Sequence, residues 1–193
     1  IRNMKDVFGL PVVVALNRFL TDTSEEIEEV RKASQEEGVE MILSQGWEKG
    51  GEGMVELAEK VVELCEMESK FTFAYDSSDS LEDKIRKLVT KVYGGAKVNF
   101  APGTRTKLKK AQELGMGSSP VCMAKTQYSF SDDPKKLGAP ENFTLTVSDI
   151  RISRGAGFVV VLTGDIMTMP GLPKVPQAEL IDVSEDGTIS GLM

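Results

Sequence analysis

The stretch LPVVVAL, residues Leu10–Leu16, decides the fold, because it is apolar on both faces and rich in β-branched valine. This pattern is typical of a buried strand in a parallel sheet. After the loop NRFLTD, Thr23 and Glu26 form a capping box for a helix that Gly38 ends. A second strand, VEMIL, and a second helix, MVELAEKVVELCE, follow at residues 39–43 and 54–66. The order is therefore β-α-β-α.

Two aromatic residues follow the two strands of this unit. Consecutive strands joined by a helix are almost always parallel, so the loops after both strands share one edge of the sheet. Phe19 lies three residues past the first strand, and Trp47, the only tryptophan, lies four past the second. Ligands of α/β proteins bind at this edge. We expect Phe19 and Trp47 to face a flat ring from opposite sides.

The second half of the chain has a different pattern. A strand, FTFAY (71–75), and a helix that begins after Ser80 lead to Gly94–Gly95, where we place a domain boundary. A basic helix and the strand-like runs PVCMAKT, FTLTVSDIRI and GFVVVLTG follow, at residues 104–114, 120–126, 143–152 and 157–164. The sequence thus predicts an α/β fold: a parallel β-α-β-α unit (1–95), then a smaller α+β domain (96–193).

Composition excludes several functions. The net charge of −7 and the absence of long basic runs argue against a nucleic-acid partner, and no apolar run is long enough to span a membrane. The absence of histidine excludes Ser-His and Cys-His catalysis and histidine-bearing zinc sites. Cys65 and Cys122 lie in apolar surroundings without metal or redox spacing, so we expect buried free thiols in a cytoplasmic protein. The start at Ile1, without an initiator methionine, indicates part of a longer protein.

The glycine-rich loop around Trp47, QGWEKGGEG, has two interpretations. Glycines before a helix can bind phosphate, but GxxxxGK[ST] is absent and Glu48 and Glu52 would repel an anion. We favour glycines that let the backbone turn tightly beside a bulky ring.

Four other features can be interpreted either as functional or as purely structural. Asn17 in LNRF resembles the guanine-binding asparagine of GTPases, but Leu20 replaces the required aspartate, so Asn17 is either a nucleotide contact or a strand cap. Asp132 and Asp133 could be an acid–base pair, although turn carboxylates fit better. Lys125 and Thr126 could line a cleft, or they could simply lie where a strand ends and exits to solvent. The lysines of residues 107–110 could form a solvated helix face, or they could attract a polyanion.

Several long blocks of the sequence resemble one enzyme family. The blocks PVVVALNRFLTDT, LSQGWEKGGEG, PVCMAKTQYSFSDDP, DIRISRGAGFVVVLTGDIMTMPGLPKVP and IDVSEDGTISGLM, in this order, are similar to the C-terminal part of formate–tetrahydrofolate ligases. The N-terminal portion with the P-loop of this family has no counterpart here. The resemblance implies an ATP-dependent ligase, in which formate attacks the γ-phosphate and the N10 amine of tetrahydrofolate then takes the formyl group from formyl phosphate.

The resemblance also implies roles for individual residues. It assigns the two plates around the folate ring to Phe19 and Trp47, with Leu43 nearby, and Leu20 stands where many members have proline. ATP with magnesium and tetrahydrofolate would be substrates of the full-length enzyme, a homo-oligomer whose N-terminal portion holds the phosphates. We expect no catalytic residue, no metal site and no required cofactor in this chain, and no role is implied for the MTMPGLP loop.

A different class of function is also consistent with the sequence. Trp47 could anchor a protein partner in a non-catalytic α/β interaction or assembly module, because tryptophan is enriched among the residues that dominate protein interfaces. Competition by a folate distinguishes the two hypotheses.

Overall fold

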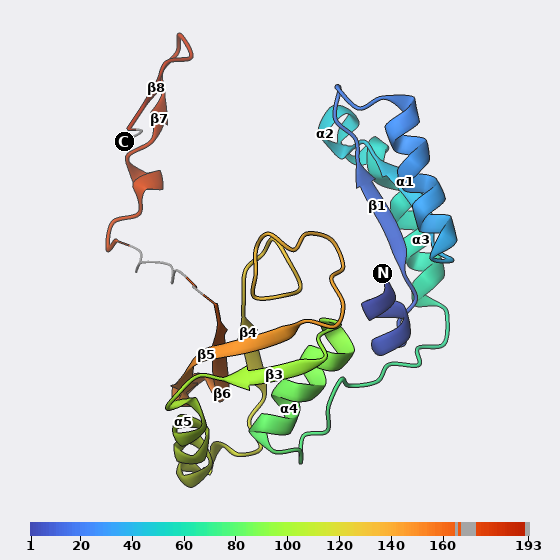
Figure 1. Ribbon diagram of the computed structural model, residues 1–193. Helices are drawn as coiled ribbons and strands as arrows, with labels where there is room; N and C mark the ends of the chain where they lie inside the picture. The colour runs from blue at the N-terminus through green and yellow to red at the C-terminus, as the bar shows by residue number, and fades with distance from the viewer. Residues whose placement is uncertain (165, 167–172, 192–193) are drawn as a thin grey trace.

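The N-terminal half is built on a pair of parallel strands. The computed structural model describes residues 1–164, 166 and 173–191. Strands β1 (Val13–Asn17) and β2 (Glu40–Ser44) pair in parallel register through α1 (Ser24–Glu36), and α3 (Val55–Cys65) follows β2 (Figure 1). The predicted β-α-β-α order is confirmed.

Helix α1 begins at the predicted capping box. The Oγ1 of Thr23 accepts a hydrogen bond from the Glu26 backbone N–H (3.2 Å), and the Glu26 carboxylate accepts one from the Thr23 backbone N–H (2.9 Å). Gly38, with φ of +69°, follows the helix and lets the chain turn into β2.

The expectation that β1 is buried on both faces is wrong. Met41 and Ile42 of β2 are buried, but no residue of β1 is, and Ala15 and Asn17 are exposed. Among the described strands β1 pairs only with β2, so its other edge is open. A parallel sheet is normally covered on both faces and both edges, which two strands alone cannot achieve.

The C-terminal half contains a mixed sheet of four strands in the order β3-β5-β6-β4. Its strands are β3 (Lys97–Phe100), β4 (Val121–Ala124), β5 (Thr144–Ser153) and β6 (Phe158–Thr163). β3 is parallel to β5 and β4 to β6, whereas β5 and β6 are antiparallel. The sequence predicted three of these strands and missed β3. With helices α4 (Leu81–Lys87) and α5 (Thr104–Ala111) this part is α+β, as expected.

The main hydrophobic core lies between this sheet and α4 with its continuation η3 (Leu88–Val92). Ile85 and Val89 are fully buried, and they belong to the same cluster of buried residues as Leu145 and Val161 of the sheet. The helix before Gly94–Gly95 therefore shares a core with the strands after it. The division at residue 95 stays a prediction, and this packing favours a boundary N-terminal to α4.

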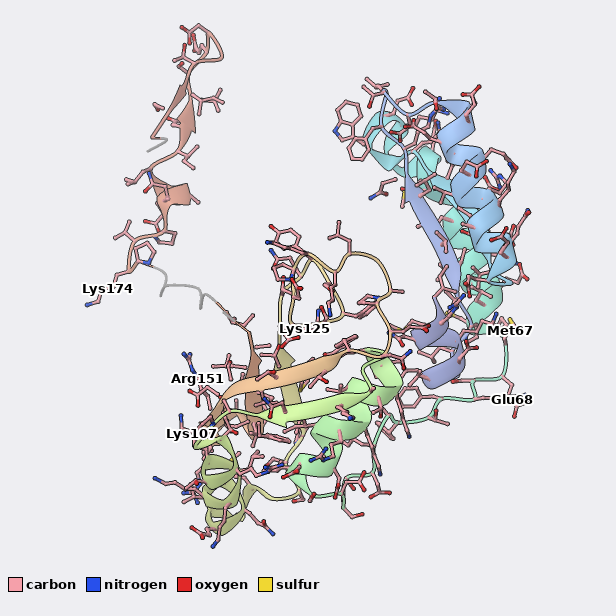
Figure 2. The ribbon with its side chains drawn as sticks, in the orientation of Figure 1. Met67, Glu68, Lys107, Lys125, Arg151 and Lys174 are labelled. Carbon is pink, nitrogen blue, oxygen red and sulfur yellow. The ribbon has the colours of Figure 1, made fainter. Side chains whose placement is uncertain are left out.

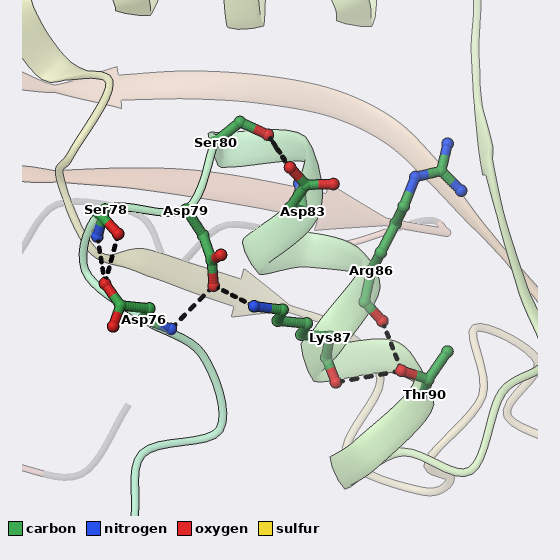
Figure 3. A network of polar contacts seen from close by, with 8 residues as sticks. All are labelled: Asp76, Ser78, Asp79, Ser80, Asp83, Arg86, Lys87 and Thr90. Carbon is green, nitrogen blue, oxygen red and sulfur yellow. Dashed lines mark hydrogen bonds and ion pairs between the residues drawn. The ribbon is translucent and has the colours of Figure 1, made fainter.

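A polar network fixes the start of α4. Ser80 caps the helix by accepting a hydrogen bond from the Asp83 N–H (3.1 Å), and Asp79 pairs with Lys87 (2.5 Å) while its carboxylate also accepts from the Asp76 N–H (2.8 Å), as Figure 3 shows. The hydrogen bond from Lys87, then that from the Asp76 N–H, lower the pKa of Asp79. The chain is thus held as it enters the helix.

Lys84 in the same helix is fully buried. Its Nζ donates to the carbonyl oxygens of Ser118 (2.8 Å) and Ser119 (3.1 Å) and lies 5.7 Å from the centre of the Tyr75 ring. Burial lowers the pKa of this amine. Lys84 therefore ties α4 to the turn that leads into β4.

The predicted strand FTFAY does not form. Residues 66–80, which we call the connecting segment, run without regular structure from α3 to α4 (Figure 1), and Met67 and Glu68 at its start are labelled in Figure 2. Among the described residues, the one backbone–backbone hydrogen bond of residues 71–75 runs from the Thr72 N–H to the Phe8 carbonyl (3.1 Å). An extended segment becomes a strand only beside another strand, and none lies there among the described residues.

The remaining elements are short. They are α2 (Gly46–Lys49), β7 (Asp182–Val183), β8 (Ile189–Ser190) and the helical turns η1 (Asn3–Val7), η2 (Gly50–Met54), η4 (Gln112–Met116), η5 (Arg154–Ala156) and η6 (Gln177–Glu179). The MTMPGLP loop (167–173) lies outside the described residues except for its last proline. No described helix has the length and apolar character needed to cross a membrane.

Both cysteines are free, but the expectation that they are buried is wrong. Cys65 is exposed as the last residue of α3, and Cys122 is exposed on β4, an edge strand of its sheet. Apolar neighbours in sequence misled the prediction, because side chains alternate between faces of a strand and Cys122 points away from the core.

Candidate functional site

Parallel pairing of β1 and β2 brings two loops to one edge of the sheet. Leu16 pairs with Leu43 and Asn17 with Ser44, so both strands end level with each other. The Arg18 N–H extends this ladder by donating to the Ser44 carbonyl (3.1 Å). The chain then leaves each strand on the same side of the molecule, as predicted.

These two loops enclose a small hollow of about 160 Å³. It is lined by Arg18, Phe19, Leu20, Gln45, Trp47, Glu48 and Lys49. Phe19 is 66% exposed and Trp47 is 82% exposed, and Leu20, which also lines the hollow, is exposed as well. Large apolar side chains gathered this openly around one hollow are suited to an apolar ligand.

The loop that carries Phe19 is held by its own backbone. The Phe19 N–H donates to a carboxylate oxygen of Asp22 (2.7 Å), and the Asp22 N–H donates back to the Phe19 carbonyl (3.1 Å). This reciprocal pair closes a tight turn of the kind that aspartate favours. It fixes the Phe19 backbone while its ring remains in solvent.

Trp47 lies in a single helical turn, α2, and not in the irregular loop that the sequence suggested. The N–H groups of Glu48 and Lys49 both donate to the Gln45 carbonyl (3.1 and 2.9 Å), and the Gln45 N–H donates to the Gly53 carbonyl (3.1 Å). The turn is therefore closed at both ends around Gln45, and it presents the indole outward.

Two of the glycines around Trp47 are needed for close packing of the loop. A Cβ on Gly53 would lie 2.5 Å from the Gln45 carbonyl oxygen, and one on Gly46 would lie 2.8 Å from the Met54 sulfur. The tight turn we favoured over phosphate binding is thus present, but its glycines make room for Gln45 and Met54 and not for the tryptophan ring.

Leu43 and Asn17 lie at the strand ends behind this hollow. Leu43 is half-buried in β2, Asn17 is exposed at the end of β1, and neither is among the residues that line the hollow. Phe19, Leu20 and Trp47 are thus brought together as predicted, with Leu43 behind them. Phe19 and Trp47 do not form a ring pair with each other, in contrast to Phe8 and Phe71 elsewhere in the described chain.

The rim of the hollow carries more positive than negative charge. Arg18 and Lys49 oppose a single carboxylate, Glu48, in a molecule whose net charge is −7. Lys49 donates to the side-chain oxygen of Gln45 (3.0 Å), another residue that lines the hollow. A ligand with an aromatic ring and an anionic tail matches this arrangement.

The other sequence candidates have internal roles. The Asp133 carboxylate accepts from the Lys135 N–H (2.9 Å), as a turn carboxylate does. That of Asp132 accepts from the Thr146 N–H (2.9 Å) and so ties this turn to β5. Within the described residues no group of three or more acidic or cysteine side chains could hold a metal ion.

Aromatic rings flank Lys125, which is labelled in Figure 2, and no pattern in the sequence indicated this contact. Its Nζ donates to the carbonyls of Thr126 (2.7 Å) and Ser129, and lies 5.5 Å from the centre of the Tyr93 ring and 5.9 Å from that of Phe130. Burial lowers the pKa of Lys125 and raises that of Tyr93. Lys125 is therefore half-buried, with its ammonium held by two carbonyls and flanked by two aromatic rings.

Comparison with known proteins gives one consistent family. The family model described as formate–tetrahydrofolate ligase matches residues 1–193. A formate–tetrahydrofolate ligase of Symbiobacterium thermophilum is 56% identical over 192 residues, which are 100% of this chain and 34% of that relative. The chain thus spans about a third of the length of the curated relative it matches. Since the family model covers every residue, the chain belongs to the formate–tetrahydrofolate ligase family.

Proposed function

We propose that this chain is the folate-holding part of a ligase that joins formate to tetrahydrofolate at the expense of ATP. The observation that carries the proposal is the hollow in which Phe19 and Trp47, from two different loops, stand exposed on one rim. Aromatic side chains bind flat heterocycles by stacking on their faces. The pterin of tetrahydrofolate would lie between the two rings, with Leu20 at its edge and Leu43 behind the hollow.

The small volume of the hollow supports a shared site. Pockets that enclose a drug-sized ligand measure roughly 300–1,000 Å³, whereas this one measures about 160 Å³. The chain would therefore supply one side of the folate site, and the N-terminal P-loop portion of the full-length enzyme would supply the rest. Arg18 and Lys49 would face the glutamate carboxylates of the folate.

The phosphate chemistry belongs in this proposal to the other portion. Phosphoryl transfer depends on positioned phosphate ligands and magnesium, and GxxxxGK[ST] is absent from these 193 residues. ATP and magnesium would bind there, formate would attack the γ-phosphate with release of ADP, and formyl phosphate would pass its formyl group to N10 as phosphate leaves. The full-length enzyme would be a cytoplasmic homo-oligomer.

Replacement of Trp47 in the full-length enzyme tests this function. Loss of one stacked face is worth about 1–3 kcal/mol, so Trp47→Ala is expected to raise the KM for tetrahydrofolate by roughly tenfold to a hundredfold. The KM values for ATP and formate should not change. Leu137→Ala, at another exposed apolar residue, is the matched control. An unchanged tetrahydrofolate KM in Trp47→Ala would favour a protein-anchoring role for the tryptophan instead.

A further inference from the structure

A second apolar surface surrounds the connecting segment. A hollow of about 890 Å³ lies there, and its lining includes Phe8, Phe73, Tyr75 and Leu88. Phe8, Phe71 and Phe73, which we call the aromatic patch, pack ring to ring: Phe8 and Phe71 are stacked with centres 6.5 Å apart, and Phe73 meets Phe71 edge-on at 4.9 Å. Phe73 is nevertheless 78% exposed.

The backbone of residues 71–75 is held on one side only. The Thr72 N–H donates to Phe8 and its hydroxyl donates to the Val7 carbonyl (2.8 Å), which attaches the segment to η1. The N–H groups of Phe73 and Tyr75 donate to no partner among the described residues. The chain bends at Ala74 and Tyr75, so only the Phe73 N–H is placed by its neighbour: in an extended stretch it points away from the side that Thr72 uses, and it marks the open edge of the segment.

The helix before this segment also exposes apolar residues. Val55, Ala58, Val62 and Cys65 of α3 are all exposed. Their spacing of three, four and three residues places them on one face of the helix. α3 therefore has two apolar faces, of which β1 and β2 cover one. The exposed face of α3 and the aromatic patch follow each other along the chain.

We propose that in the full-length ligase a strand from outside these 193 residues pairs with residues 71–75 and covers the aromatic patch. The curated relative has about two thirds of its length outside the matched part, which provides ample chain for this contact. An open edge beside exposed aromatic rings is the structure to which another strand adds. The unformed strand FTFAY is then a strand whose neighbour lies elsewhere in the enzyme. The inference rests on family membership and is independent of the folate proposal.

Amide hydrogen exchange on the full-length ligase tests the pairing without any substitution. Strand pairing should slow exchange of the Phe73 and Tyr75 amides about a thousandfold relative to unpaired amides, because they can then exchange only when the sheet opens. Fast exchange of both amides would overturn the proposal. Protection that appears only at concentrations where the ligase self-associates would also overturn it, because a second copy would then be the occupant.

Substitution of Phe73 tests the cover over the patch. Phe73→Asp in the full-length ligase would bury an unpaired carboxylate, and we expect its thermal midpoint to fall by at least about 4 °C. Leu137→Asp places the same charge at an exposed leucine in the loop between β4 and β5 and should leave the midpoint unchanged. An equal midpoint for both variants would show that Phe73 remains in solvent.

Discussion

At the scale of single residues, Trp47 and Phe19 stand out because their surroundings fix the backbone and leave the rings free. Asp22 closes the turn at Phe19, and the Gln45 carbonyl receives the amides that follow Trp47. A ring held only through its backbone keeps its apolar faces in water until a ligand covers them. The cost of that exposure is recovered on binding, as in a preformed ligand site.

The two rings should act as a unit on one ligand. In the full-length enzyme, Phe19→Ala and Trp47→Ala should each weaken tetrahydrofolate binding by roughly tenfold to a hundredfold. The second substitution should cost less than it does alone, because a pterin held on one face can tilt away. Equilibrium titration of the two single variants and the double variant measures this coupling. Strictly additive losses would mean that the rings contact different parts of the folate.

Lys84 should contribute to stability through its two carbonyl partners. Lys84→Met keeps the length of the side chain but leaves the Ser118 and Ser119 carbonyls without their donor, which should lower the free energy of unfolding by about 1–3 kcal/mol. Burial lowers the pKa of Lys84, so the unfolded chain holds the proton more tightly. The wild-type advantage should therefore grow as the pH rises toward 10.5, the ordinary pKa.

Urea unfolding of the two proteins at about pH 8 and about pH 10 measures this difference. Arg154→Met, at an exposed residue of η5, controls for the loss of one positive charge. A wild-type advantage that shrank with rising pH would mean that the ammonium is better solvated in the folded protein than we infer.

At the scale of elements, α1 depends on its capping box. Thr23→Ala removes the acceptor of the Glu26 N–H and the hydroxyl that donates to the Glu26 carboxylate. It keeps the Thr23 backbone N–H, whose hydrogen bond chiefly lowers the pKa of that carboxylate. We expect the free energy of unfolding to fall by about 0.5–2 kcal/mol. Thr21→Ala, two residues earlier in the loop, should have no such effect. Denaturant unfolding monitored by circular dichroism distinguishes them, and equal midpoints would contradict a role for the cap.

Elements with local signals were predictable, and those that depend on distant neighbours were not. The capping box specified α1 and the apolar runs specified β1, β2, β5 and β6, because each signal lies within the element. β3 was missed because Val98 and Phe100 alternate with polar residues over only four positions, and because its partner strand β5 lies far away in sequence. FTFAY has a strong strand pattern, but a pattern cannot supply the second strand.

The candidate site was also predictable only where its signals are local. The parallel crossover rule placed Phe19 and Trp47 on one edge, and Leu20 joins them there. The short helix around Trp47 was not predictable, since its closure depends on Gln45 reaching Gly53 across the loop. Lys49 and Arg18 escaped notice because isolated charges on a loop carry no pattern.

At the scale of the whole molecule, the two halves differ in how much they bury. Most buried apolar residues belong to the cluster around β3–β6, α4 and α5, whereas the β1–β2 half buries chiefly Val39, Met41 and Ile42. Regions with little buried apolar surface open most readily. The half that presents Phe19 and Trp47 therefore gains more stability than the other half does when a strand covers α3 and the connecting segment, as we propose.

The chain of 193 residues should not catalyse the reaction by itself. Without positioned ligands for the phosphates, phosphoryl transfer loses most of its acceleration. We expect no formate-dependent release of ADP from residues 1–193 in a coupled assay, with a full-length family member as the positive control. Release that required formate and exceeded the rate without protein would place catalytic groups in this part.

The two exposed thiols allow the distance between the two halves of the chain to be measured. Cys65 ends α3 in the first half and Cys122 lies on β4 in the second, and these are the only cysteines in the 193 residues. Spin labels on the pair would report the separation of the two halves directly. The connecting segment is anchored by Thr72 at η1 and by Asp79 at Lys87. A narrow distribution of spin–spin distances would mean that these anchors hold the two halves in one relative orientation. A broad distribution would identify the connecting segment as a hinge.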